Sequence, residues 1–489
     1  MRKTELQNQE QSCSAELSVN GELFQNHLLT QIKHDIVKYA PSKIIGVIAN
    51  LMLIPLYTSL LQPKEYGLYM IAVSTLSFIC ILFSDWVGLA ALRMFRENVL
   101  SDNIKSYFGT LVMLLVVNLT VMYVSGFLTF GQICNFFKIP SDVLLVVFLL
   151  IIPVAIRCLL SQVLRAQIKP LSYTFSTIFN QFLTIGISLY FIKFWHMGAK
   201  ALLFGMAGSI IVTDIIMFIQ CNAFKSTDLK AAKASILSGF YKYGVPIAMA
   251  DLGLWIISQS NRFVLQHFKG ASFNGILGVG YNLTFSMLLQ VASIITMAAI
   301  PRLFQIYEAG ANTKGILTKL TSYYMMVFSP IIFILFMYPQ QVAATFSNKS
   351  YSEAHTIIPF LALSAFLYGL TEYTTIQYHL AKKTYITTII RIVPGVIGLL
   401  LSIYLIPKIG IIGIGMSTLV SYILYFALSV IINVKNLRWN PPYKDIFKIV
   451  AALACCGVYA CITKNLLPFA SQIVALTLIY IAAIRLQKY

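Results

Sequence analysis

The stretch Val143–Ile156, VLLVVFLLIIPVAI, decides the fold class of this chain, because it holds no charged and no hydrogen-bonding side chain. Extended to residue 164, it reaches the ~20 residues that a helix needs to cross a bilayer core of ~30 Å. Similar runs recur from Ala40 to the C-terminus with little between them. Only 11% of the 489 residues are charged, against about 25% in a soluble domain. The sequence therefore predicts an all-α polytopic membrane protein.

Fourteen membrane helices are predicted from these runs, each near the length of one crossing. Six belong to a first block, six to a second block, and two close the chain. The predicted ranges are 40–61, 67–92, 107–130, 141–164, 172–194, 199–220, then 239–263, 275–300, 317–338, 355–380, 385–406, 411–432, and finally 446–463 and 466–484.

The net charge of +19 is explained by membrane topology rather than by nucleic-acid binding. With the N-terminus placed inside, 25 of the 36 Lys and Arg residues fall on cytoplasmic segments and 9 on the opposite loops. Lys and Arg gather in cytoplasmic loops and fix orientation. Both termini are therefore predicted to be cytoplasmic. The polar residues 1–35 are predicted to form a cytoplasmic tail, and we expect no removable signal peptide.

An internal repeat relates the two blocks of six. Gly67 begins the second predicted helix and Arg93 ends it, and Gly275 and Arg302 stand in the same places of the eighth. Because six is an even number, the two halves share one orientation, as in transporters with parallel repeats. The predicted division is a tail (1–35), a first bundle (36–220), a basic linker (221–238), a second bundle (239–435) and a two-helix extension (436–489).

Charged residues inside the spans are the main candidates for chemistry, because one at the bilayer centre costs about 2.5–3.5 kcal/mol on insertion scales. Two readings are open for most of them. They can form structural ion pairs, with Glu372–Arg391 and Arg157–Asp214 as the expected partners, or they can bind a coupling H⁺ or Na⁺. This group comprises Asp85, Arg157, Asp214, Asp251, Glu372 and Arg391.

Uncharged polar residues in the spans, which can bind sugar hydroxyls or join helices, are Asn50, Asn118, Gln181, Gln259, Asn261, Asn282, Gln290 and Gln377. Neither the histidines nor the eight cysteines show metal-ligand spacing. No G-x-x-x-x-G-K-[ST] loop is present. We therefore expect no metal, no cofactor and no catalytic residue.

Four stretches resemble the bacterial polysaccharide (O-antigen) flippases, the Wzx-like members of the MOP exporter superfamily. The longest, Leu53–Tyr69, reads LIPLYTSLLQPKEYGLY and resembles that family's helix 1–2 hairpin. The others are SDWVGL (84–89) followed by Arg93, LRAQ (164–167) followed by Tyr173, and IPKIGIIG (406–413).

This resemblance implies two pseudo-symmetric six-helix bundles of the MATE/MOP type in the bacterial inner membrane. It also implies movement of an undecaprenyl-diphosphate-linked oligosaccharide from the cytoplasmic to the periplasmic leaflet. A polymerase and a chain-length regulator of the same pathway would be its partners. Because the family's cavity lies between helices 1, 2, 7 and 8, the residues implied to meet the diphosphate are Lys43, Arg93, Arg262 and Arg302.

Other classes stay open at this point. Another MOP-type exporter would move drugs by cation antiport or carry the peptidoglycan lipid precursor. A membrane polysaccharide polymerase would need a long periplasmic loop with catalytic residues, and the longest outside loop, about 339–354, holds only Lys349 and Glu353 as charged groups.

Overall fold

The protein is described by a computed structural model over residues 45–100, 103–167, 169–221, 232–293, 303, 307, 313–381, 383–432, 439–463 and 468–486. Within these ranges the chain is helical with no strand, and fourteen long or apolar helices confirm the predicted architecture. Ten are long and apolar enough to cross a membrane, or eleven if the bent pair at 349–380 is one span.

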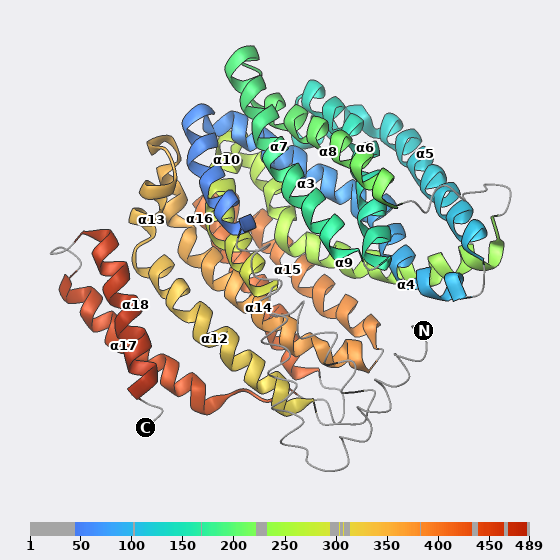
Figure 1. Cartoon of the computed structure of the whole chain (residues 1–489). Coiled ribbons are helices and arrows are strands. Elements are labelled where there is room, and N and C mark those ends of the chain that lie inside the picture. The colour runs from blue at the N-terminus through green and yellow to red at the C-terminus, as the bar shows by residue number, and fades with distance from the viewer. Residues whose placement is uncertain are drawn as a thin grey trace, which may run out of the picture.

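The first bundle, called the N-bundle, fills the upper part of Figure 1. Its first two helices form the predicted hairpin, and the second runs without a break through a π segment. Its helices are Ile45–Leu60, α3 (Pro63–Cys80) continued by η1 (Ile81–Asp85) and α4 (Trp86–Leu100), α5 (Ile104–Phe137), α6 (Ser141–Ala166), α7 (Pro170–Trp195) and α8 (Ala199–Cys221).

The second bundle, called the C-bundle, repeats this order, and its second helix also contains a π segment. Its first helix, α9, is 36 residues long and runs between the two bundles (Figure 1). Its helices are α9 (Ala234–Lys269), α10 (Ala271–Tyr281) continued by η4 (Asn282–Ser286), α12 (Lys314–Met337), α14 (Ile358–Leu380), α15 (Thr384–Ile409) and α16 (Ile411–Ile431).

The last two helices, α17 (Tyr443–Thr463) and α18 (Phe469–Leu486), form a hairpin at the edge of the C-bundle (Figure 1). They pack on α12, where the Ser322 hydroxyl donates to Asp445 at 2.6 Å and the Tyr480 hydroxyl donates to the Met326 carbonyl at 3.0 Å. Their other side is apolar and exposed, which suits a lipid-facing position.

Helix ends follow from local sequence. Pro63 and Pro170 stand at the first positions of α3 and α7, where a missing N–H removes no hydrogen bond. Gly270 and Gly410 end α9 and α15 with φ of +86° and +64°, values that favour glycine. The tight turns that result join consecutive antiparallel helices, so few residues lie outside the spans.

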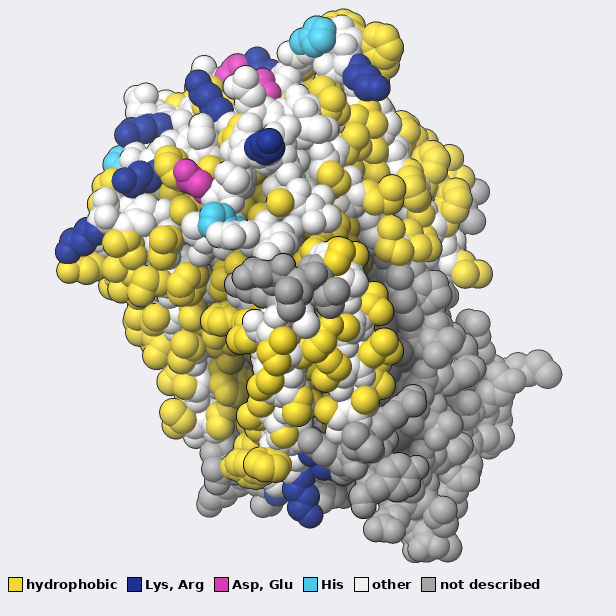
Figure 2. All heavy atoms as spheres, turned by 90° about the vertical axis from the view of Figure 1, so that its left-hand side faces the viewer, with side chains coloured by type: hydrophobic (Ala, Val, Ile, Leu, Met, Phe, Trp, Pro, Cys, Tyr) yellow, Lys and Arg dark blue, Asp and Glu magenta, His cyan; other side chains and the backbone are white. Residues whose placement is uncertain are grey.

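One end of the bundles carries a short folded segment, which we call the cap, residues 339–356. It consists of α13 (Pro339–Phe346) and η5 (Lys349–Thr356), and the face that bears it is the cap face. The cap takes the place of the outside loop predicted at 339–354. Figure 2 shows charged and histidine side chains gathered at the top of the molecule above a band of hydrophobic side chains. That band is the surface expected against lipid.

Candidate functional site

The two bundles meet at a seam formed by α3 of the N-bundle and by α9 and α10 of the C-bundle. At the cap face α3 and α10 cross with their backbones in contact. A Cβ added to Gly67 would overlap the Ala271 carbonyl, and one added to Gly275 would overlap the Pro63 carbonyl. Gly67 and Gly275 are 208 positions apart, and so are Pro63 and Ala271, whose carbonyls they meet. The crossing is therefore reciprocal, as across a two-fold axis, and only glycine permits this approach.

Hydrogen bonds continue across the seam below this crossing. The Asn282 amide donates to the Tyr66 hydroxyl at 2.9 Å, and the Ser74 hydroxyl donates to the Gln259 side-chain oxygen at 3.0 Å. Each bond joins α3 to a helix of the C-bundle. Asn282 and Gln259 are two of the polar residues noted in the sequence, and here they join the bundles.

Arg262, on α9, lies at the seam and is only 4% exposed. Its Nε donates to the Gln259 oxygen at 2.9 Å, and its guanidinium lies 5.1 Å from the centre of the Tyr281 ring. Its Nη1 is buried and has no hydrogen-bond partner. An unpaired donor in a medium of low dielectric is costly. Arg262 is therefore a buried cation with an N–H donor available for a further hydrogen bond.

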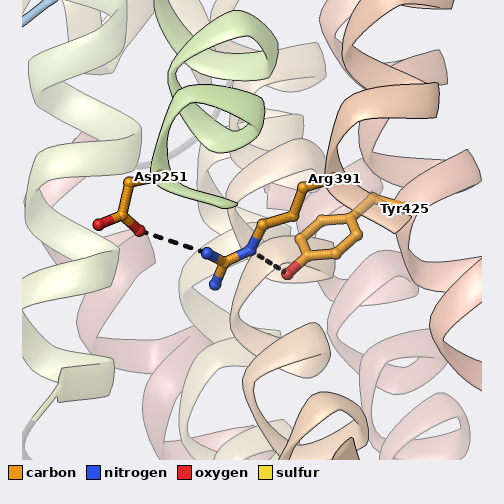
Figure 3. Close-up of polar contacts among 3 residues, drawn as sticks. All are labelled: Asp251, Arg391 and Tyr425. Atoms are coloured by element: carbon orange, nitrogen blue, oxygen red, sulfur yellow. Dashed lines mark hydrogen bonds and ion pairs between the residues drawn. The ribbon is translucent and has the colours of Figure 1, made fainter. Parts of the chain in front are cut away.

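A second charged group lies farther along α9, nearer the face opposite the cap. Arg391, on α15, forms an ion pair with Asp251 at 3.5 Å, and its Nε donates to the Tyr425 hydroxyl at 3.2 Å (Figure 3). Glu372 also lies within electrostatic reach of Arg391. The expected pair Glu372–Arg391 is thus corrected to Asp251–Arg391, because α15 packs mainly on α9 and only slightly on α14.

Asp85 ends the π segment of the N-bundle and approaches this group from the other side of the seam. It accepts a hydrogen bond from Ser84 at 3.3 Å and lies within electrostatic reach of Asp251. Among the described residues, neither Asp85 nor Glu372 has a cation within ion-pair distance. Asp251 and Glu372 thus lie near Arg391, and Asp85 lies near Asp251.

Arg157 and Asp214 lie away from the seam, inside the N-bundle. One Arg157 nitrogen donates to Asn180 and to Thr213, each at 2.5 Å. Asp214 lies within electrostatic reach of Arg157 but not at ion-pair distance, so the expected Arg157–Asp214 ion pair is not formed. Asp214 is 7% exposed, and its Oδ1 has no hydrogen-bond partner. It lines an otherwise apolar hollow of about 630 Å³ between α6 and α8.

The remaining predicted residues are less informative. Arg93 is exposed in the middle of α4, because this helix continues to Leu100 and does not end at Arg93 as predicted. Lys43 and Arg302 lie outside the described residues. In the part of the chain that the structure describes, no cluster of three or more His, Cys, Asp or Glu side chains is suited to a metal ion. Of the four basic candidates, Arg262 is the one whose surroundings the structure defines and whose side chain is buried.

The sequence places the chain in a family. A profile of the family Polysacc_synt, described as polysaccharide biosynthesis protein, matches residues 33–307, which is more than half of the chain. The chain therefore belongs to this family. No curated protein matches the sequence.

The fold is that of the MOP superfamily of transporters. A structure titled "Lipid II flippase MurJ, inward closed conformation" aligns with a TM-score of 0.74 at 13% identity, over 92% of this chain and 97% of the other. An inward-facing multidrug resistance MATE family transporter of the MOP superfamily aligns with a TM-score of 0.64 at 12% identity, over 79% and 93%. A MOP superfamily transporter from Pyrococcus furiosus aligns with a TM-score of 0.59 at 14% identity, over 87% of this chain and 97% of the other. The chain thus belongs to a polysaccharide biosynthesis family and has the fold of the MOP superfamily transporters.

Proposed function

We propose that the protein is a flippase that carries an undecaprenyl-diphosphate-linked oligosaccharide from the cytoplasmic to the periplasmic leaflet of the bacterial inner membrane. The Polysacc_synt membership and the MurJ-like fold support a lipid-linked substrate. The charge bias of the loops supports cytoplasmic termini, with the cap on the periplasmic side. Lys43, Arg93 and Arg302 remain in this proposal as further contacts of the diphosphate.

The physical task fits a seam between two bundles. A sugar hydroxyl without a partner costs several kcal/mol in hydrocarbon, so an oligosaccharide does not cross a bilayer unaided at a useful rate. A polar seam accepts the headgroup, while the polyprenyl tail stays in lipid. No part of this task forms or breaks a covalent bond.

The observation that carries the proposal is the buried, incompletely bonded Arg262 at the seam. A guanidinium binds phosphate oxygens through parallel N–H donors. Arg262 has such a donor to offer, because its Nη1 has no hydrogen-bond partner. The Tyr66 and Tyr281 side chains border the same group. A diphosphate that reached Arg262 would replace a missing hydrogen bond rather than compete with an existing one.

A driving ion belongs to the same proposal. Asp251 is neutralised by Arg391, whereas Asp85 and Glu372 have no cation within ion-pair distance among the described residues. One elementary charge that moves through 100 mV supplies about 2.3 kcal/mol. Either carboxylate is a candidate carrier for H⁺ or Na⁺.

The test is complementation of a strain that lacks its own polysaccharide flippase, with surface polymer measured at matched expression. We expect Arg262→Ala to lose at least ten-fold in polymer, because each charge-assisted hydrogen bond contributes about 1.5–3 kcal/mol. Arg262→Lys should retain part of the activity, since it keeps the charge and loses the fork. Arg165→Ala removes an exposed arginine from the end of α6 and should behave like the parent.

The alternative substrates are separated by the choice of strain. If the protein complements a strain depleted of its peptidoglycan lipid-precursor flippase but restores no surface polymer in the polysaccharide strain, its substrate is the peptidoglycan precursor. Normal polymer from well-expressed Arg262→Ala would remove Arg262 from the mechanism.

A further inference from the structure

The cap is a folded unit that belongs to the C-bundle. Asn348 begins η5 by accepting a hydrogen bond from the Ser350 amide, and η5 meets α14 at an angle of 57°. The Ile357 side chain, at this bend, packs against Gly280 of α10. Because α10, α13 and α14 all contact η5, the cap moves with the C-bundle if the bundles move apart.

The same cap is bonded to the N-bundle. The Tyr351 hydroxyl donates to the Leu61 carbonyl at 2.9 Å, and the Asn348 amide donates to the Thr58 hydroxyl at 3.3 Å. The last carbonyls of a helix have no acceptor role within it, and Leu61 follows helix Ile45–Leu60 directly. The cap therefore supplies a donor that this helix end would otherwise take from water.

Tyr351 also joins this attachment to the crossing of α3 and α10. Its ring is fully buried and meets the Tyr66 ring edge-on, with centroids 6.1 Å apart. Tyr66 in turn accepts the hydrogen bond from Asn282 of the C-bundle. Tyr351 thus contacts both Leu61 of the N-bundle and Tyr66, whose hydroxyl takes part in the hydrogen bond across the seam.

We propose that the cap is a latch that holds the two bundles closed at the cap face, with Tyr351 as the group that is released when the seam opens there. The latch goes beyond the proposed function in that it concerns the resting state of the protein, whatever is carried. For the seam to open at this face, α3 must part from α10, and the cap, fixed to α10, must then leave Leu61 and Thr58. The two hydrogen bonds are between neutral groups, each of modest net strength, so the attachment is reversible.

The experiment measures how often the seam opens, without any substrate. Ser74→Cys is introduced into the full chain with its eight native cysteines replaced. Ser74 lies at the seam, about 17 Å along α3 from Pro63, and is 3% exposed. Its labelling by a membrane-impermeant maleimide is followed in right-side-out and in inside-out vesicles.

Tyr351→Phe removes only the hydroxyl, and Tyr351→Ala removes the ring as well. We expect Tyr351→Phe to raise the labelling rate from the cap side about three- to ten-fold, as loss of one net hydrogen bond implies, and Tyr351→Ala to raise it further. Tyr324→Phe is the matched control, because Tyr324 is equally buried and donates to the Phe366 carbonyl at 3.0 Å inside the C-bundle. Its labelling rate should equal that of the parent.

Unchanged labelling in both Tyr351 variants, with protein of parental yield and size-exclusion profile, would overturn the latch. An equal rise in Tyr324→Phe would also overturn it, since the effect would then be general loosening. Labelling that appears in the opposite vesicle orientation would correct the topology and keep the latch. A chain that labels as expected but restores no surface polymer would refute the proposed function and keep the latch.

Discussion

The reciprocal crossing of α3 and α10 makes a quantitative prediction about two glycines. Gly67→Ala and Gly275→Ala each place a methyl group on a backbone carbonyl of the facing helix. A carbonyl fixed in a helix cannot turn aside, so the helices must separate by about 1 Å or more to restore a C···O contact of ~3.3–3.6 Å. Overpacking of this kind costs about 1–3 kcal/mol. We expect each variant to lower the apparent unfolding temperature of the purified protein and to raise Ser74→Cys labelling from the cap side.

The symmetry of the contact predicts how the two changes combine. Because one separation of the helices makes room for both methyl groups, the double variant should cost less than twice the single ones. The controls are Gly131→Ala and Gly186→Ala, which lie in spanning helices with no atom within 4 Å of the added Cβ. These should be neutral or stabilising by about 0.5–1 kcal/mol. If Gly67→Ala were as well tolerated as Gly186→Ala, or if the two seam variants were fully additive, the close reciprocal crossing would be wrong.

Two further predictions concern the buried charges. Asp251→Asn and Arg391→Gln should each lower the free energy of unfolding by about 1–3 kcal/mol, which is less than for a fully buried ion pair because Asp251 is partly exposed. The double variant should lose less stability than the sum of the two single losses. A double-mutant cycle of thermal unfolding measures this difference. Asn180→Ala should cost about 1–3 kcal/mol, because it leaves the Arg157 guanidinium with Thr213 as its one remaining hydrogen-bond partner among the described residues; unchanged stability would show that the arginine finds another partner.

The number and order of the helices follow from the sequence, because in a membrane the length of an apolar run nearly equals the length of a helix. The predicted helix bounds are less accurate where single residues at a helix end decide where the helix starts. α3 begins at Pro63 rather than 67, since proline starts helices well. α9 begins at Ala234 rather than 239, ahead of the predicted end of the linker. The cap was predicted as a plain loop, although Pro339 is a signal for the start of α13.

The ion pairs between buried charged residues cannot be predicted from the sequence in the same way. A helix that is apolar on all sides carries no pattern that tells which face meets which neighbour. Glu372 and Arg391 lie on consecutive helices, yet the partner of Arg391 is Asp251, 140 positions away. Gly67 and Gly275 were visible as a repeat, but their contact with each other appears only when the two halves are packed together.

The two π segments show where the likeness of the halves stops. A π turn holds an extra residue and often marks a functional site in a helix. η1 begins after the 18 residues of α3, whereas η4 begins after the 11 residues of α10. The wide turns therefore lie about 10 Å apart in depth. A helix that bends at its wide turn would bend at a different depth in each half, so the two halves would not keep their two-fold relation as the seam opens.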